Sequence, residues 1–302
     1  MRAILLVFSL LVSLSASACD LCGCANGGAY FGILPQVGRS FVGLRYRTSS
    51  YESHLNSRLL RTREVFHTTE LWGRFYPAKR VQVLAFVPVQ FNQQTQLSDG
   101  SVRRERGLGD ATVLANYNLF NTFWDTTRTH RVNHSLLLGG GLKLPTGRFR
   151  YDPANDAQVA NENFQLGTGS VDGLVSLLYS IRVGRWGLNT DVTARLNTTN
   201  AQQYRFGNRL TANSLLFYVH ETKGATFMPN VGIYLETAAR DHRNGVENDQ
   251  TGGYVTMANA GLEVYLKRFS LGATGQLPLA QNLADQQVRA NARATVHVTV
   301  MF

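Results

Sequence analysis

The last fifteen residues of the chain alternate between apolar and polar side chains. Even-numbered positions from Ala290 to Phe302 are apolar, whereas odd-numbered positions from Arg289 to Thr299 are polar. Because successive side chains of a strand point to opposite faces, this segment predicts a strand with one apolar and one polar face. A soluble domain rarely leaves such a strand at an open edge, where it invites aggregation. A transmembrane β-barrel needs it, with lipid outside and polar groups inside.

The same period of two recurs along the rest of the chain, and it is clearest from Val81 to Phe91. We therefore predict an all-β fold, a transmembrane antiparallel β-barrel of about 12 strands, an even number being typical of single-chain bacterial barrels. The predicted strands are 40–48, 66–76, 81–91, 110–119, 136–144, 171–181, 186–196, 210–218, 231–235, 258–264, 269–277 and 288–302.

The predicted connections alternate in length. Short ones follow even-numbered strands, at 77–79, 182–184 and 267–268. Long polar ones follow odd-numbered strands, at 49–63, 92–107, 145–165, 197–207, 240–252 and 278–287. Short periplasmic turns and long outer loops are the usual asymmetry of outer-membrane barrels, so this alternation also predicts the orientation.

The amino terminus indicates export. Arg2 precedes the apolar run Ala3–Leu14 and the small residues Ala16-Ser17-Ala18, which is the pattern of a secretory signal peptide. We predict a cleaved signal peptide at 1–18, a cysteine-rich periplasmic segment at 19–29 and a barrel at 30–302. The terminal Phe302 resembles the signal that the barrel-assembly machinery reads in bacterial outer-membrane proteins. The predicted location is the outer membrane of a Gram-negative bacterium, with membrane lipid as a partner.

The formal net charge of +10 raises nucleic acid as a partner. The basic residues are scattered without a lysine or arginine run, and an exported protein meets no chromosome, so we exclude that partner. A basic pore wall or contact with anionic lipid head groups accounts better for the charge.

Charges of both signs fall on the predicted inward parity. Closure pairs the first strand with the last, which should put Arg45, Arg47, Arg289 and Arg293 on one wall. Two interpretations stay open, a salt-bridge network that fills a narrow lumen and a basic track for anionic solutes. The predicted charged lumen residues are Arg45, Arg47, Glu70, Arg74, Asp110, Lys143, Asp172, Asp191, Arg195, Arg209, Glu236, Glu263, Arg289 and Arg293.

Apolar side chains also fall on the inward parity of several strands. They either pack against an inward loop or the amino-terminal segment, or they form a path for an apolar or amphipathic solute. Both interpretations argue against a wide general porin, whose lumen is strongly polar. The predicted apolar lumen residues are Leu84, Phe86, Leu114, Leu137, Leu174, Leu178, Leu215 and Phe217.

All three cysteines, Cys19, Cys22 and Cys24, lie in one Cys-x-x-Cys-x-Cys motif. This motif could hold one disulfide and a free thiol, or it could bind a soft metal, Cu(I) or Zn(II). Three thiolates suit Cu(I) better than a closed tetrahedral zinc site. Lipidation of Cys19 is the third alternative.

The sequence predicts no enzyme. His134 and Ser135 are the adjacent pair closest to an esterase pattern, but consecutive strand residues point to opposite faces.

Three glycine-rich stretches, 107–110, 141–147 and 165–170, together with the closing strand, resemble the outer-membrane "transporter" family named for the MetA pathway of phenol degradation. The resemblance implies a barrel that moves small molecules, hydrophobic ones among them. The glycines also have a plain role in bending strands and forming turns at the barrel rim.

Two functions follow from these patterns. The first is an outer-membrane barrel that passes or imports a small solute, hydrophobic or aromatic, through a narrow lumen. The alternative is a copper-handling or structural barrel, whose cysteine segment binds a soft metal or a periplasmic partner while the barrel serves as anchor.

Overall fold

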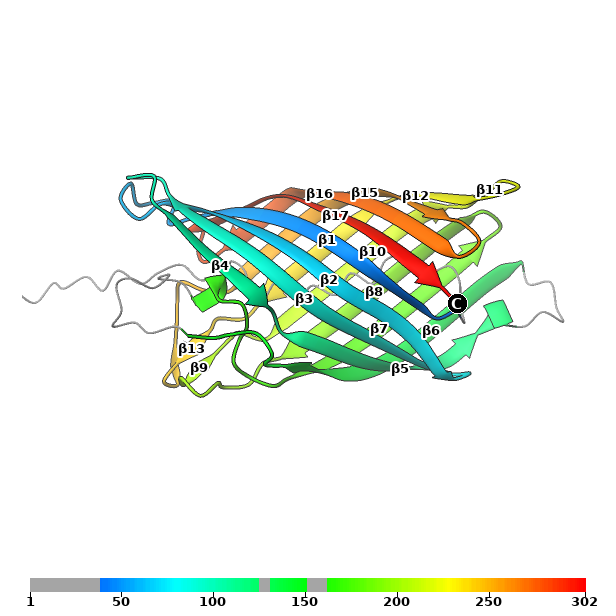
Figure 1. Ribbon diagram of the computed structural model, residues 1–302, viewed down its shortest axis with the longest axis horizontal. Helices are drawn as coiled ribbons and strands as arrows, with labels where there is room; N and C mark the ends of the chain where they lie inside the picture. Colours follow the sequence, from blue (N-terminus) through cyan, green and yellow to red (C-terminus); the bar gives the residue numbers. More distant parts are fainter. Residues whose placement is uncertain (1–38, 125–130, 151–161) are drawn as a thin grey trace, which may run out of the picture.

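The fold is a closed antiparallel β-barrel of twelve strands, seen in a computed structural model (Figure 1). The structure describes residues 39–124, 131–150 and 162–302; the predicted signal peptide and cysteine segment lie outside these ranges. The strand prediction is confirmed. The barrel strands, in ladder order, are β1 Phe41–Ser53, β2 Thr62–Ala78, β3 Val81–Gln96, β5 Ala111–Asn121, β6 Val132–Leu144, β7 Asp172–Val183, β8 Trp186–Leu196, β10 Arg209–Tyr218, β12 Thr226–Ala238, β15 Gly253–Tyr265, β16 Phe269–Leu283 and β17 Val288–Met301, which pairs with β1.

The remaining elements are short. β4 (Val102–Leu108) pairs with β3, β11 (His220–Glu221) pairs with β12, and η1 (Thr122–Trp124) and η2 (Glu162–Phe164) are 3₁₀ turns. β9 (Tyr204–Arg205), β13 (His242–Arg243) and β14 (Val246–Glu247) form a small sheet of their own. Figure 1 shows β4, β9 and β13 gathered at one end of the barrel, and β17 running toward the other end. We call these the outer and the inner end.

The strands present an apolar surface outward and bury polar groups inward. Large apolar side chains such as Leu44, Val231 and Val298 are exposed, as expected for side chains that face lipid. Buried polar side chains such as Asn116, Asn213 and Ser176 point the other way. Among the described residues, no helix is long and apolar enough to cross a membrane.

The predicted loop at 92–107 is wrong, because most of it is a β-hairpin. β3 continues to Gln96, and its residues from Val89 to Thr95 pair with β4. The alternation of apolar and polar residues is lost here, because both faces of β3 carry polar side chains from Asn92 to Gln96, and Asn92 and Gln94 are buried.

The predicted inward position of Arg289 is also wrong. β17 carries a bulge, since Ser49 of β1 pairs with Arg293 while Tyr51 pairs with Ala290. Because of this extra residue, the side chains of β17 that precede Arg293 point to the opposite face from the one that the alternation predicts. Ala290 is therefore buried, at 1% exposure, although the alternation put it outside. The Arg289 side chain is 51% exposed and pairs with Glu52 at 2.9 Å.

Candidate functional site

The inner half of the lumen is lined by one continuous apolar cluster, which we call the apolar belt. Phe41 at the start of β1 and Met301 at the end of β17 place it near the inner end. The belt consists of Phe41, Trp72, Leu84, Phe86, Leu114, Leu174, Leu178, Leu215, Phe217, Val219, Met228, Tyr265 and Met301, with Leu137 packed against it. The structure thus brings all eight predicted apolar lumen residues together.

Glycines on neighbouring strands make room for the large belt side chains. A Cβ atom at Gly187 would lie 2.2 Å from the ring of Phe217 on the adjacent strand. A Cβ atom at Gly141 would lie 2.1 Å from the carbonyl oxygen of Val113 and 3.0 Å from Cγ of Leu114, so it would meet both the backbone and a belt side chain of the adjacent strand. The belt therefore depends on cross-strand pairs of a glycine with a bulky residue, which the alternation of one strand does not reveal.

Ion pairs lie directly against the belt. Arg45 donates to Glu70 at 2.6 Å, and its guanidinium lies 4.9 Å from the ring centre of Trp72 and 5.4 Å from that of Phe86. His297 contacts the buried Glu263 at 3.1 Å. A charge shielded from water in this way requires a close partner, which each of these carboxylates has.

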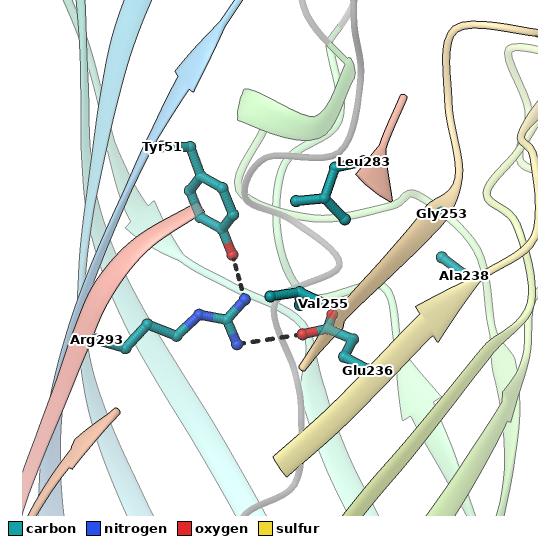
Figure 2. A pocket seen from close by; sticks show the side chains of 7 residues that line it. All are labelled: Tyr51, Glu236, Ala238, Gly253, Val255, Leu283 and Arg293. Atoms are coloured by element: carbon teal, nitrogen blue, oxygen red, sulfur yellow. Dashed lines mark hydrogen bonds and ion pairs between the residues drawn. The ribbon is translucent and has the colours of Figure 1, made fainter. Parts of the chain in front are cut away.

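A second group of charges lies around Arg293 and Glu236 (Figure 2). Arg293 donates to Glu236 at 3.2 Å and to the hydroxyl of Tyr51 at 2.8 Å, and Arg209 donates to Glu236 at 2.9 Å. Tyr51, Glu236 and Arg293 border a small cavity with room for about one water molecule. The cavity is lined by Tyr51, Glu236, Ala238, Gly253, Val255, Leu283 and Arg293.

A third group, the lysine latch, consists of Lys143, Asp110, Asp172, Gly147 and Thr168. The ammonium group of Lys143 lies 2.7 Å from Asp110 and 2.9 Å from Asp172, and it also donates to the Thr168 hydroxyl. Asp110 in turn accepts bonds from the backbone N–H groups of Gly147 at 3.0 Å and Thr168 at 2.8 Å. The latch therefore ties the connection between β6 and β7 to the wall.

The end of that connection folds into the lumen; we call residues 162–170 the inward segment. Phe164 is buried against Phe66 of β2, with ring centres 5.8 Å apart. Gln90 of β3 donates to the carbonyl of Leu166 at 3.1 Å. The inward segment belongs to a different apolar cluster from the belt, so it covers the lumen nearer the outer end.

Residues of the outer loops form hydrogen bonds and an ion pair with the inward segment. Asp241 accepts a bond from the Tyr204 hydroxyl at 2.6 Å and from the Gly207 N–H at 2.6 Å, and Asn163 reaches it at 3.5 Å. Burial raises the pKa of the Asp241 carboxyl, although these hydrogen bonds oppose the rise. Arg243 of the small sheet forms an ion pair with Glu162.

The other predicted charged residues are placed as follows. Arg74 is buried with its guanidinium 4.9 Å from the ring centre of Phe41, and Arg47 is half-buried on β1. Asp191 and Arg195 are buried on β8. Only Arg289 of the fourteen predicted charges is exposed. The choice between a structural network and a basic track stays a prediction.

Several residues of the lumen escaped the sequence prediction. Trp72, Met228 and Tyr265 complete the belt, and Phe164 and Leu166 form the apolar part of the inward segment. Phe164 and Leu166, two large apolar residues near the end of the long predicted connection, were the available signal for the inward segment. Within the described ranges, no group of three or more His, Cys, Asp or Glu side chains is placed to hold a metal ion. The cysteine motif lies outside those ranges, so its metal site stays a prediction.

Residues 46–285 match the family described as "Putative MetA-pathway of phenol degradation". The chain belongs to this family. Among solved structures, it is similar to an outer-membrane channel from Pseudomonas putida F1, with a TM-score of 0.63, 14% identity, and coverage of 88% of this chain and 96% of that chain. It is also similar to the β domain of the Bordetella autotransporter BrkA, with a TM-score of 0.53, 10% identity, and coverage of 87% and 100%.

No match was found among curated proteins. The shared fold places this family member in the outer membrane of a Gram-negative bacterium, with lipid around its apolar surface.

Proposed function

We propose that this barrel passes a small apolar solute, aromatic compounds included, across the outer membrane through its lumen, and that it catalyses no reaction. The apolar belt carries the proposal, because an open diffusion porin has a polar lumen and would not need it. The family description, which refers to phenol degradation, supports this class of solute. The similar Pseudomonas structure is an outer-membrane channel, which supports passage through the barrel.

The belt discriminates between polar and apolar solutes by the free energy that each requires to leave water. A polar solute gives up hydrogen bonds among belt side chains that cannot replace them, whereas an apolar solute gains from the same contacts. Next to the belt, Arg45 forms an ion pair with Glu70, and the carboxyl group of Glu263 has His297 as its partner. The belt is therefore the step at which apolar solutes are favoured.

The test is the Leu178→Asn variant, which puts an amide of similar size into the belt. Leu178 is buried on β7. We expect influx of the apolar dye N-phenylnaphthylamine to fall about fivefold, since a buried amide without partners disfavours the belt as an apolar path. Influx is measured by dye fluorescence in a Gram-negative host that produces each variant in an intact outer membrane.

Leu178→Met is the matched control, because it keeps both volume and apolar character, and it should pass the dye at the wild-type rate. Influx of the polar β-lactam nitrocefin, read by a periplasmic lactamase, should not fall in either variant. Equal dye influx through the Asn and Met variants would mean that the dye does not pass through the belt.

We further infer that the barrel-assembly machinery reads Phe302. Its side chain is 70% exposed at the inner end, while its backbone N–H donates to Ser40 at 3.0 Å. Deleting Phe302 leaves the β1–β17 register intact, so we expect less barrel in the outer membrane without a change in refolding in detergent. Heat-dependent mobility on gels measures both quantities. An unchanged amount in cells contradicts the signal role.

A further inference from the structure

The barrel wall formed by β17, β1, β2, β3 and β4 changes from apolar to polar on its outward face near the outer end (Figure 1). The outward side chains of β3 are apolar up to Phe91, which is exposed, and continue with Gln93 and Thr95. On β1 the last large apolar side chain that faces out is Tyr46, whose hydroxyl lies 2.7 Å from Nδ1 of His67 on β2. A tyrosine with an apolar ring and a polar tip is typical of the boundary between acyl chains and head groups. The lipid-facing surface of this wall therefore ends at about the level of Tyr46 and Phe91.

Five arginine side chains lie on the outward face at or just beyond this boundary, and we call them the arginine patch. They are Arg61, Arg63, Arg104, Arg106 and Arg289.

Two members of the arginine patch come from β4. Arg106 lies opposite Phe91 in the β3–β4 ladder, and Arg104 lies opposite Gln93, to which its Nε donates at 3.2 Å. Because they are two residues apart in a strand, both arginines point to the same face, with their Cα atoms about 7 Å apart. Leu108 follows on that face and is also exposed. β4 therefore presents two cations directly beside exposed apolar side chains.

The other three members surround a single carboxylate. Glu52 is buried on the outward side of β1, opposite Arg63 of β2 and Arg289 of β17. The Glu52 carboxylate lies 2.7 Å from Arg61, 3.4 Å from Arg63 and 2.9 Å from Arg289. Arg289 reaches this position because of the bulge in β17, which turns its side chain outward. One carboxylate neutralises one of the three cations, so two positive charges remain at this point.

The arginine patch as a whole has an excess of positive charge. In the part of the chain that the structure describes, no carboxylate other than Glu52 lies within 4 Å of these five guanidinium groups. Like charges repel one another at this spacing, so the patch favours an anion next to it. All five cations are arginines, whose planar group donates two parallel hydrogen bonds to a phosphate.

We propose that the arginine patch binds the phosphate groups of lipid A, the phosphorylated glycolipid of the outer leaflet, while its acyl chains lie against Phe91 and Leu108. The patch faces away from the lumen, so a solute inside the barrel does not meet it. The exposed apolar side chains next to the arginines favour an anion that carries acyl chains over a dissolved anion. Binding of lipid A is a property of the outer surface and is independent of passage through the belt.

The test is the affinity of the refolded barrel for lipid A in detergent micelles, measured by native mass spectrometry. We expect the double variant Arg104→Gln, Arg106→Gln to raise the apparent Kd about tenfold, because two charge-assisted contacts with phosphate are lost. The matched control is Lys267→Gln, Arg268→Gln, which removes two exposed cations from the turn between β15 and β16 at the inner end. This control should bind lipid A as the wild type does.

The double variant Arg63→Gln, Arg289→Gln is an independent test, because Arg61 remains as the partner of Glu52. We expect it to raise the apparent Kd about fivefold. Heat-dependent gel mobility shows which variants fold, and if one double variant does not fold, the other decides.

Two further measurements identify the ligand. Lipid A from which both phosphates have been removed should bind to the wild type at least tenfold more weakly, and a hundredfold excess of inorganic phosphate should leave lipid A bound. Equal affinity of the wild type and the folded arginine variants, or of the two forms of lipid A, overturns the proposal. Displacement of lipid A by inorganic phosphate would mean that the patch takes a dissolved anion, and this also overturns it. Dye influx through the barrel is measured separately, so the proposed function stands or falls independently of these outcomes.

Discussion

The Lys143→Met variant is expected to conduct ions through an open outer end and to unfold at a lower temperature than the wild type. The substitution keeps an unbranched side chain, one atom shorter, but leaves the buried Asp110 and Asp172 without their cation. Removing one partner from a buried ion pair costs about 3–5 kcal/mol. The two carboxylates are expected to turn toward water. The hydrogen bonds that Asp110 accepts from the backbone N–H groups of Gly147 and Thr168 will then be lost. Single-channel conductance in planar bilayers and thermal unfolding in detergent measure the two effects.

Two controls separate the latch from general damage. Lys267→Met makes the same change at an exposed lysine of the turn between β15 and β16, and it should alter neither property. The triple variant Lys143→Met, Asp110→Asn, Asp172→Asn carries no uncompensated charge, so it should regain much of the lost stability. Wild-type conductance in folded Lys143→Met would mean that Phe164 and Gln90 hold the inward segment without the latch.

A second large effect is expected at the lipid-facing surface of β17. Val296 is 49% exposed and lies between β1 and β16, opposite Tyr46 and Ala273. An arginine at the bilayer midplane costs about 2–4 kcal/mol, so Val296→Arg should fold into lipid vesicles with a much lower yield. Heat-dependent gel mobility after refolding measures the folded fraction.

Val246→Arg provides the matched comparison, since Val246 is highly exposed in the small sheet of the outer loops. This variant should refold as the wild type does, because its arginine stays in water. Equal yields from the two variants would contradict the assignment of Val296 to the lipid-facing surface.

The sequence could predict the membrane-spanning parts because lipid imposes a period of two on each strand. The predicted strand 186–196 matches β8 residue for residue. Leu84 and Phe86 were recognisable as lumen residues because they occupy the polar parity of a strand that is otherwise regular. In both cases one short segment contains the whole signal.

The remaining features depend on contacts between segments. The β3–β4 hairpin is defined by its pairing, because both faces of β3 are polar there and its residues resemble a loop. The parity change at Arg289 comes from a bulge against β1, which the alternation of β17 alone does not contain. The closeness of Gly187 to Phe217 depends in the same way on the register of β8 with β10.

The pairing of β1 with β17 also sets the order in which the molecule can be completed. This ladder joins Phe41 to Met301, two residues separated by nearly the whole described chain, whereas most other ladders join strands that are close in sequence. Contacts of such long sequence separation form slowly, because the entropy of closing the loop must be overcome first. Until the ladder forms, both strands present open edges. Folding therefore ends with a slow closing step, during which the β1 and β17 edges need protection from other chains.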